Sequence, residues 1–366
     1  MRAPGPEPRW PRRASPSTPT VSPAPERKVT VADVAAEAGV SVATVSKVLN
    51  GRPDVASDTR TRIEAILSAR GYVPTKRTRR AATTEERRGG LVEMLFNDPS
   101  TPWAAEMIRG AELTARAARV GIVVSVRQSG SKGVQQWLDD VEHRGSRGIV
   151  LALSDFSPAD QKRVAKLGLP TVLVDPVGDF DTDLPSIGAG NWGGGMAATR
   201  HLLELGHRRI GIITGPMRFL CSQARLAGYR VALERAGVGS DPSLIAHGDF
   251  HHASGLASAA GLLDLPEPPT AIFAANDEQG TGVYAAIQQR GLRIPHDISV
   301  VGFDDVPMSQ WVSPPLTTVR QPIAELAALA IRAALSRPGA PELPQGRMEL
   351  STSLIVREST APPRTG

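Results

Sequence analysis

The sequence predicts a small all-α helix-turn-helix headpiece followed by an α/β body of two lobes with parallel sheets. Two observations favour this fold class. Near the N-terminus apolar residues recur at helical spacing, and beyond residue 90 short apolar runs alternate with longer amphipathic segments, as in βαβ units. The predicted strands and helices are too many for one sheet, so we expect two similar lobes and a ligand cleft at the carboxyl ends of the strands.

Composition excludes several other classes of protein. The 366 residues are 41% hydrophobic and 22% charged, which is ordinary globular usage. The single Cys221 permits neither an internal disulfide nor a Cys-rich zinc site. No apolar run approaches the roughly 18 residues that cross a bilayer, and no apolar signal segment opens the chain. We therefore expect a cytoplasmic protein with no membrane partner, no metal and no cofactor.

Charge is unevenly distributed along the chain. Residues 1–88 hold 17 Lys and Arg against 9 Asp and Glu, a net charge of +8, whereas the whole chain has +5. A basic head on a mildly acidic body indicates a polyanion partner for the head. Residues 1–26 are rich in Pro, Arg, Ser and Thr and predict a disordered tail, which either attracts the polyanion weakly or, as we favour, is a solvated extension.

Residues 27–73 predict three short helices, the first two forming a helix-turn-helix. Ala35 is small where two helices cross, and Gly39 can take the positive φ that the turn needs. Ser41 stands at the N-cap of the second helix, and Asp58 is placed to cap the third. An arbitrary Ala/Val-rich hairpin would not need these residues at these places, so the pattern indicates DNA binding.

Side chains at the start of the second helix are the candidate base readers, because this end of a recognition helix meets base edges in the major groove. Val42 and Ala43 offer apolar contact to a thymine methyl, and Lys47 can donate to guanine. Short polar side chains suit phosphate contacts instead; these are Ser41, Thr44, Ser46 and Asn50. As alternatives to DNA contact, the candidate base readers are simply exposed helix surface, and the short polar residues cap the helix locally.

The body is expected to begin at residue 90, after a basic hinge or linker at 74–89. The apolar runs predict strands at 91–95, 122–126, 149–153, 172–174, 210–213, 271–275 and 299–303. The amphipathic segments predict helices at 104–119, 134–144, 158–167, 223–236, 254–263 and 280–290.

Polar residues follow several of these strands, where a cleft would expose them. Asp175 closes TVLVD, Asn276 and Asp277 close AIFAAN, and Asp304 follows VVGF. Sugar recognition needs such carboxylates and amides for hydroxyls, an arginine that donates in a fork, and an aromatic plate for the ring face. As an alternative, Asp175 or Asp277 caps a helix.

The segment VTVADVAAEAGVSVATVSKVLNGRPDVASDTRTRIEAILSARGYVPT resembles the headpiece of the lactose-repressor and purine-repressor family. The likeness continues through HLLELGHRRIGIITGP, ARLAGYRVAL, TAIFAANDEQGTGVYAA, LRIPHDISVVGFDD and PPLTTVRQP. It implies two lobes similar to periplasmic sugar-binding proteins, joined by crossover strands, in a body over 90–358. The implied limits are 90–190 and 322–339 for lobe 1, 191–319 and 340–358 for lobe 2, and a tail at 359–366.

The resemblance also implies site residues. Arg225 in ARLAGY and Asp304 in GFDD match the family's effector-binding arginine and aspartate. Further ligand-lining positions are matched by Trp103, Asp175, Phe250 and Asn276. Alternatively, Arg225 makes an internal salt bridge and the aromatic residues belong to the core. By family analogy 103–119 and 222–229 form a homodimer interface, and no heptad repeat follows 353–356, so a dimer is expected.

One departure from the family concerns the hinge. After Tyr72-Val73-Pro74 the family has a helix whose leucine wedges into the minor groove, and Ala81 falls at that leucine position here. We expect no wedge. Instead Arg77, Arg79 and Arg80, with Tyr72 beside them, are expected to contact phosphates or a narrow minor groove. The alternative is a solvated basic linker.

Enzyme readings are rejected. Gly188, Gly190 and Gly193 spell G-x-G-x-x-G, but far from the first strand of a lobe and without the acidic residue that should follow. The chain is therefore expected to be a cytoplasmic, nucleoid-associated repressor of carbohydrate-utilisation genes. It would bind a near-palindromic operator in double-stranded DNA as a homodimer, released by a mono- or oligosaccharide effector. The alternatives are a corepressor-type regulator responding to a nucleobase or other metabolite, and a sugar-sensing module that binds no DNA.

Overall fold

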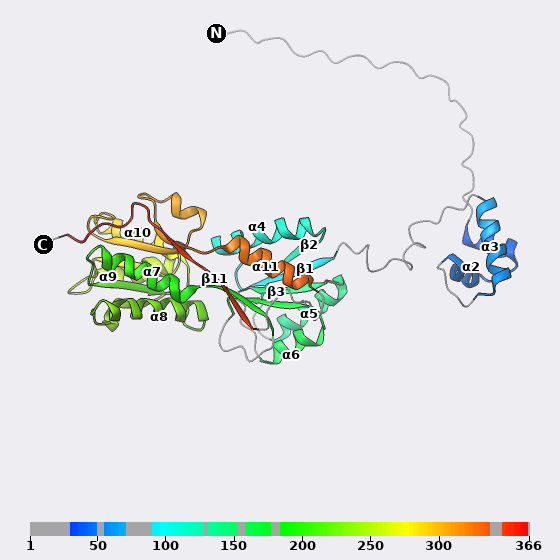
Figure 1. Ribbon diagram of the computed structural model, residues 1–366, viewed down its shortest axis with the longest axis horizontal. Helices are drawn as coiled ribbons and strands as arrows, with labels where there is room; N and C mark the ends of the chain where they lie inside the picture. The colour runs from blue at the N-terminus through cyan, green and yellow to red at the C-terminus, as the bar shows by residue number, and fades with distance from the viewer. Residues whose placement is uncertain are drawn as a thin grey trace, which may run out of the picture. The chain divides into compact units, whose positions relative to one another are not determined.

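The computed structural model describes residues 30–49, 55–70, 90–127, 131–152, 158–176, 184–336 and 346–364. The chain divides into two compact units, Met1–Arg88 and Gly89–Gly366, and both are drawn in Figure 1. The expected tail at 1–26 and the expected linker at 74–89 lie outside the described residues. No helix in the described part of the chain is long and apolar enough to span a membrane.

The first unit contains the three predicted helices, α1 (Val31–Ala38), α2 (Val42–Leu49) and α3 (Ser57–Ala69). Thr30 and Asp33 form a capping box that starts α1, in which the Asp33 amide donates to Thr30 Oγ1 and the Thr30 amide to the Asp33 carboxylate. The helices enclose a small core, formed by Val34, Ala35, Ala38, Val45, Val48 and Ile63.

The expected cap of the third helix is wrong. The N-cap of α3 is Ala56, which makes no side-chain cap, and Asp58 lies inside the first turn. There its carboxylate still complements the positive end of the helix dipole.

The second unit holds two six-stranded sheets, each central to one lobe (Figure 1). In the first lobe the order is β11-β5-β4-β3-β1-β2, and every pairing is parallel. Its strands are β1 (Leu91–Phe96), β2 (Gly121–Val126), β3 (Gly148–Ala152), β4 (Thr171–Val174), β5 (Ser186–Ala189) and β11 (Arg347–Leu350). Its helices are α4 (Pro102–Ala117), α5 (Ser131–Arg144), α6 (Pro158–Lys166) and α11 (Ile323–Leu335).

The second lobe repeats this pattern with the order β12-β10-β9-β8-β6-β7, in which only β12 is antiparallel to its neighbour. Its strands are β6 (Ile210–Thr214), β7 (Ile245–His247), β8 (Ala271–Ala274), β9 (Ser299–Asp304), β10 (Thr317–Arg320) and β12 (Ser353–Ile355). Its helices are α7 (Asn191–Glu204), α8 (Leu220–Arg235), α9 (His252–Leu263) and α10 (Asp277–Gln289), with short 3-10 helices η2 (Pro242–Leu244) and η3 (Pro307–Gln310).

The chain crosses between the lobes three times, and the last crossing corrects the expected boundaries. The segment 340–358 was assigned to the second lobe, but β11 pairs with β5 in the first lobe and only β12 joins the second. Residues 359–366 were expected to be a tail. Ser359 is instead fully buried, donating to the Val300 carbonyl and accepting from the Thr317 amide, so this segment secures the second lobe.

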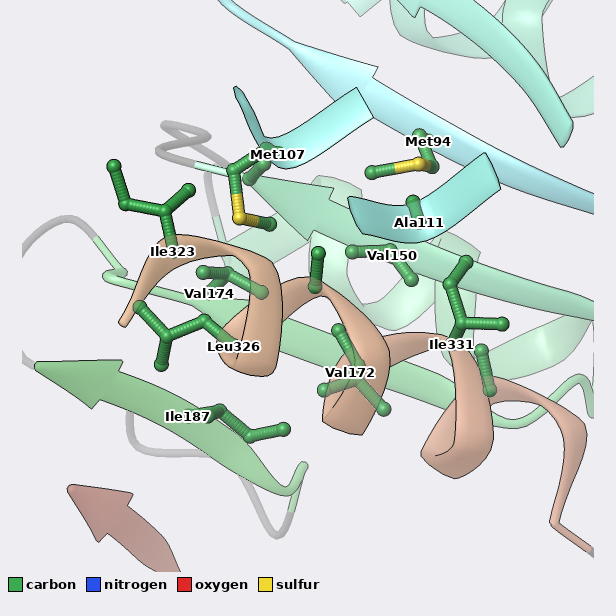
Figure 2. Packing of buried hydrophobic residues seen from close by; sticks show 14 of the residues in the cluster. Met94, Met107, Ala111, Val150, Val172, Val174, Ile187, Ile323, Leu326 and Ile331 are labelled. Atoms are coloured by element: carbon green, nitrogen blue, oxygen red, sulfur yellow. The ribbon is translucent and has the colours of Figure 1, made fainter. Parts of the chain in front are cut away.

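One core of the first lobe lies between its sheet and the helices α4 and α11, and a second contains Trp137 of α5 and Val164 of α6. Figure 2 shows Ile323, Leu326 and Ile331 of α11 beside Met107 and Ala111 of α4, over strand residues that include Val150, Val172, Val174 and Ile187. These side chains are buried. Their removal from water favours folding by roughly 1.5 to 3 kcal/mol for each large aliphatic side chain. The two helices therefore fix the strand ends from which cleft residues project.

Candidate functional site

The helix-turn-helix places its candidate readers at the start of α2. Gly39 has φ of 63°, a left-handed conformation that ends α1 and turns the chain. Ser41 Oγ then accepts from the Thr44 amide at 3.1 Å, which confirms Ser41 as the N-cap. The Thr44 hydroxyl lies 2.9 Å from the same oxygen. Both short side chains thus take part in capping α2, and their phosphate contacts stay a prediction.

The exposed face of α2 carries the three candidate base readers. Val42 is 51% exposed, and Ala43 and Lys47 are exposed as well, whereas Val45 and Val48 are buried. A single exposed apolar side chain is ordinary on a protein surface, so the contact of Val42 with a thymine methyl stays a prediction. Ser46 is half-buried on the same helix. The remaining DNA-contact candidates lie outside the described residues; they are Asn50, Tyr72, Arg77, Arg79 and Arg80.

A cavity in the second unit brings together all six effector residues expected from the sequence. Its volume is about 420 Å³, including the part open to solvent. The first lobe contributes Trp103 and Asp175, and the second contributes most of the rest. The lining consists of Thr101, Trp103, Asp175, Cys221, Arg225, Phe250, Asn276, Asp304 and Gln321. We call this cavity the inner compartment.

Arg225, in the middle of α8, is the central cation of the inner compartment. Its Nε donates to Asn191 Oδ1 at 2.9 Å and its Nη1 donates to the Ala275 carbonyl. Its Nη2 lies 3.7 Å from Asp304 Oδ1, and its guanidinium lies 3.7 Å from the centroid of the Phe303 ring. The guanidinium is thus held in one orientation by two hydrogen bonds, an ion pair and a cation–π contact.

A close approach of α7 to α8 places Arg225. A Cβ added to Gly195 of α7 would lie 2.4 Å from the Arg225 carbonyl oxygen and 2.9 Å from its Cα. Any side chain there would separate the two helices. Glycine inside a helix is unfavourable by roughly 1 kcal/mol relative to alanine, so its presence here reflects the packing of the site.

Asp304 lies at the carboxyl end of β9 and is almost fully buried. Burial raises the pKa of Asp304 to about 7, although the Arg225 cation and a hydrogen bond from Gln321 Nε2 both favour the carboxylate. The buried carboxylate of Asp277 also has a raised pKa, first because of desolvation and then because of Asp304. Of these two carboxyl groups only Asp304 lines the inner compartment.

Asp175 and Asn191 connect the two lobes at the base of the inner compartment. Asp175 follows β4 in the first lobe, and its Oδ1 accepts from Asn191 Nδ2 at 3.3 Å. Asn191 begins α7 in the second lobe and bonds Arg225 through its other amide atom. Burial raises the pKa of Asp175, with Arg225 acting against it. A continuous polar network thus runs from one lobe to the other.

The hydrogen bonds at the start of α10 show which residue caps this helix. Asn276, not Asp277, is its N-cap, since Asn276 Oδ1 accepts from the Gln279 amide at 2.9 Å. Asp277 instead accepts from the Val306 amide and the Thr318 hydroxyl. Asn276 also lines the cavity, and its Nδ2 donates to the Phe250 carbonyl at 2.9 Å. Asn276 therefore both caps α10 and lines the inner compartment.

Three of the six lining residues expected from the sequence have left-handed backbones. The φ values are 43° for Asp175, 76° for Phe250 and 108° for Asp304. Non-glycine residues adopt this region at a cost of roughly 1 to 3 kcal/mol, and such residues cluster at ligand sites. All three residues line the inner compartment.

Sequence reasoning missed Asn191, Gln321 and Thr101. Asn191 follows β5 and Gln321 follows β10, and each of these strands has only four residues, too few for a periodic signal. Cys221 also lines the cavity, and burial raises the pKa of its thiol to about 12, so it is inert as a nucleophile at neutral pH.

Together the two units define a class of protein: a helix-turn-helix joined to a two-lobed α/β receptor with a polar cleft. Comparison with known proteins gives the same class. Residues 30–75 match the family described as bacterial regulatory proteins, lacI family, and residues 199–360 match the periplasmic binding protein-like domain.

Similar proteins extend over nearly the whole chain. The HTH-type transcriptional repressor CytR of Escherichia coli strain K12 is 33% identical over 337 residues, covering 92% of this chain and 97% of that protein. Among solved structures, the transcriptional regulator CelR–cellobiose complex has a TM-score of 0.69 and 31% identity, covering 91% of this chain and 100% of that one. The lac repressor dimer bound to operator and the anti-inducer ONPF has a TM-score of 0.68 and 28% identity, covering 92% and 100%.

The chain belongs to the lacI family of bacterial regulatory proteins. It is a ligand-responsive transcriptional repressor, not an enzyme, with a DNA-binding helix-turn-helix and a periplasmic-binding-protein-like receptor body.

Proposed function

We propose that this protein represses carbohydrate-utilisation genes as a dimer on a near-palindromic operator, and that a sugar in the inner compartment releases it. The observation that carries this proposal is the convergence of Arg225, Asp175, Asn276 and Asp304 on one cavity. Their donors and acceptors suit neighbouring hydroxyl groups. Trp103 and Phe250 supply aromatic surface for the face of a sugar ring.

A known ligand of a similar protein supports the sugar. The CelR structure holds cellobiose, and it is 31% identical to this chain. Because the present chain offers carboxylates, a fixed guanidinium and aromatic rings in one cavity, a polyhydroxylated ring fits it better than an apolar ligand. A nucleobase corepressor is the competing class, and tighter operator binding in its presence would identify it.

The operator contacts are assigned to α2 and the basic linker. Val42 and Ala43 would meet thymine methyl groups, and Lys47 would donate to guanine O6 and N7 in the major groove. Ser41, Thr44, Ser46 and Asn50 would position the helix on phosphates, with Tyr72 at the start of the hinge. In place of the family's leucine wedge, Arg77, Arg79 and Arg80 would add electrostatic contacts to the backbone or minor groove.

The dimer would use α4 and the exposed face of α8. Leu113 of α4 is 56% exposed and is therefore accessible to a partner. Within 222–229 the buried side chains pack inside the chain, so only exposed positions such as Gln223 and Ala227 remain for a partner. The lac repressor structure is a dimer on operator, which supports the same arrangement here.

Effector binding would act by differential affinity for two arrangements of the lobes. A coupling free energy of roughly 1 to 3 kcal/mol changes operator affinity about 5- to 150-fold. A gel shift with the gene's own upstream region, titrated with sugars that raise the melting temperature of the protein, tests this proposal. Release of the duplex is expected. A duplex that stays bound at every concentration of such sugars would contradict induction.

A further inference from the structure

Two consecutive residues at the end of β9 have left-handed backbones. Asp304 has φ of 108° and Asp305 has φ of 57°. Asp304 lines the inner compartment and Asp305 does not. Non-glycine residues rarely adopt this region, and they persist in it only where the surrounding contacts hold them. The contacts of Asp305 therefore bear on where the Asp304 side chain lies.

The carboxylate of Asp305 lies between two arginines. Arg320 Nε donates to Asp305 Oδ2 at 2.6 Å, and Arg357 Nη2 donates to Asp305 Oδ1. The Ser309 hydroxyl also donates to Asp305 Oδ1, at 3.2 Å. Because the Asp305 side chain is only 3% exposed, these charged hydrogen bonds are shielded from water. We call Asp305, Arg320 and Arg357 the aspartate clamp.

The two arginines of the aspartate clamp differ in their surroundings. Arg357 Nη1 donates to the Leu316 carbonyl at 2.7 Å and to the Ser309 hydroxyl at 3.2 Å. The Arg357 side chain is 14% exposed, whereas that of Arg320 is 54% exposed. Arg357 is thus fixed by several hydrogen bonds inside the lobe, and Arg320 reaches Asp305 from the solvent side. Arg320 can therefore be truncated without opening the core.

The aspartate clamp also adjoins a second residue of the inner compartment. Arg320 is the last residue of β10, directly before the chain crosses to α11, and Gln321 follows it. Gln321 donates to Asp304 twice, from its amide to the carbonyl oxygen at 3.2 Å and from Nε2 to Oδ1. Gln321 lines the inner compartment, and its Oε1 is buried with no hydrogen-bond partner among the described residues. Asp304 and Gln321, the chain neighbours of Asp305 and Arg320, are therefore fixed together with the clamp.

We propose that Asp305 is a positioning residue: through the aspartate clamp it holds the backbone of Asp304 left-handed, so that the Asp304 carboxyl and the Gln321 amide face the inner compartment. The inference rests on the proposed function, because Asp304 is one of the groups assigned there to the effector. Asp305 itself touches no ligand. The competing role is purely structural, in which the clamp only secures η3 through Ser309.

The first test needs no ligand. It measures by urea denaturation, at pH 4 and pH 8, how much Asp304→Asn changes the free energy of unfolding in the wild type and in the Asp305→Asn background. Burial raises the pKa of Asp304 to about 7, so in the wild type the effect of Asp304→Asn differs between the two pH values. Most of this difference is expected to be lost in the Asp305→Asn background, because a released carboxyl reaches water.

A purely structural clamp gives another result. Asp305→Asn then lowers stability, but the contribution of Asp304 still differs between the two pH values. The comparison isolates the position of Asp304, since in both backgrounds the same charged residues surround it; these are Asp175, Arg225, Asp277 and Glu278.

The second test measures binding of ribose, glucose and cellobiose to the full chain by calorimetry. For a sugar that binds the wild type, Asp305→Asn is expected to weaken affinity about tenfold, as for the loss of one hydrogen bond to a charged group. Operator affinity without sugar is expected to be unchanged. Arg320→Ala is expected to act in the same direction by a smaller factor in both tests. Because Arg320 is exposed, this variant carries both tests if Asp305→Asn does not fold.

Asp264→Asn is the matched control. It breaks an ion pair of 2.7 Å with Arg290 in the same lobe, and neither residue lines the inner compartment. Sugar affinity and the pH-dependent contribution of Asp304 are both expected to match the wild type in this variant.

The two tests separate this proposal from the proposed function. A pH-dependent contribution of Asp304 that survives in both clamp variants would overturn the positioning role, whatever the change in melting temperature or sugar affinity. Loss of that contribution, with no probe sugar bound by the wild type, would support the positioning role and count against the proposed function. Loss of it with sugar affinity unchanged would support the positioning role and remove Asp304 from the sugar contacts.

Discussion

Arg225 Nη2 lies 3.7 Å from Asp304 Oδ1, and the two side chains are only 4% and 6% exposed. A buried cation and a buried carboxyl group so placed stabilise each other, and removal of one leaves the other in a costly environment. The pair lies where the second lobe faces the ligand, since both residues line the inner compartment. The fold therefore already holds in place the two groups that we propose for ligand binding.

Arg225→Ala is expected to abolish the effector response while operator affinity stays intact. The substitution removes the donors that the inner compartment directs at a ligand, and the helix-turn-helix lies in another unit of the chain. Arg230→Ala, an exposed arginine on the same helix, is the control. Operator binding measured by fluorescence anisotropy with and without effector checks both. A response that survives in the Arg225 variant would remove this residue from the site.

Asp304→Asn is expected to change the pH dependence of stability. Because the folded-state pKa of Asp304 is about 7 and its ordinary value is 3.8, the folded protein holds a proton that the unfolded chain releases earlier. Stability from this group is therefore present below about pH 4, falls as the pH rises toward 7, and is level above 7.

The asparagine variant has no such loss of stability, so relative to the wild type it should gain on the order of 4 kcal/mol between pH 4 and pH 8. Urea denaturation of both proteins across this range gives the comparison. Parallel pH profiles would show that Asp304 is ionised throughout.

Gly195→Ala is expected to destabilise the second lobe by about 1 to 3 kcal/mol, because the new methyl group meets the backbone of Arg225. Effector affinity should fall with it. Gly193 is in the same helix, and a Cβ there meets no atom within 4 Å. Gly193→Ala should therefore stabilise the protein by roughly 0.5 to 1 kcal/mol. Thermal denaturation of the two variants should shift in opposite directions, and shifts of the same sign would refute the close-packing argument.

Lys47→Ala is expected to weaken binding at one operator base pair by roughly 1 to 3 kcal/mol, since a lysine that reads guanine contributes to one position. The measurement is a competition assay over single base-pair substitutions of the operator. If the variant loses the same affinity on every sequence, Lys47 contacts phosphate and does not read a base.

Arg79→Ala and Arg80→Ala are each expected to lower the salt slope of operator binding by about one unit, because each removed phosphate contact releases one counterion fewer. Arg230→Ala in the body serves as the control. Slopes that match the wild type in both linker variants would support the solvated-linker alternative.

Much of the fold could be predicted from the sequence because local patterns determine it. The apolar runs predicted the bounds of β1, β3, β6, β8 and β9 to within about two residues. The amphipathic segments likewise predicted helices such as α9. Helix α7 was missed because Gly193, Gly194 and Gly195 obscure a helical pattern. Gly194 and Gly195 are needed for close contacts with β9 and α8 that only the tertiary structure shows. Strand β11 was assigned to the wrong lobe since four residues carry no information about their partner.

The site was predictable where a polar residue ends a predicted strand. Asp175 and Asn276 follow β4 and β8, Asp304 ends β9, and the topology brings all three to one cavity. Asn191 and Gln321 were missed because their strands are short and give no periodic signal. Their roles come from distances to Arg225 and Asp304, residues 34 and 17 positions away in the chain.

The most direct test of the central claim is the affinity of the full chain for a duplex from its own upstream region, measured at low ionic strength across a titration of cleft ligands. We expect specific binding that weakens about 5- to 150-fold as a sugar fills the cleft. An affinity that stays constant from zero to saturating ligand, or a protein that holds no such duplex in either state, would contradict it.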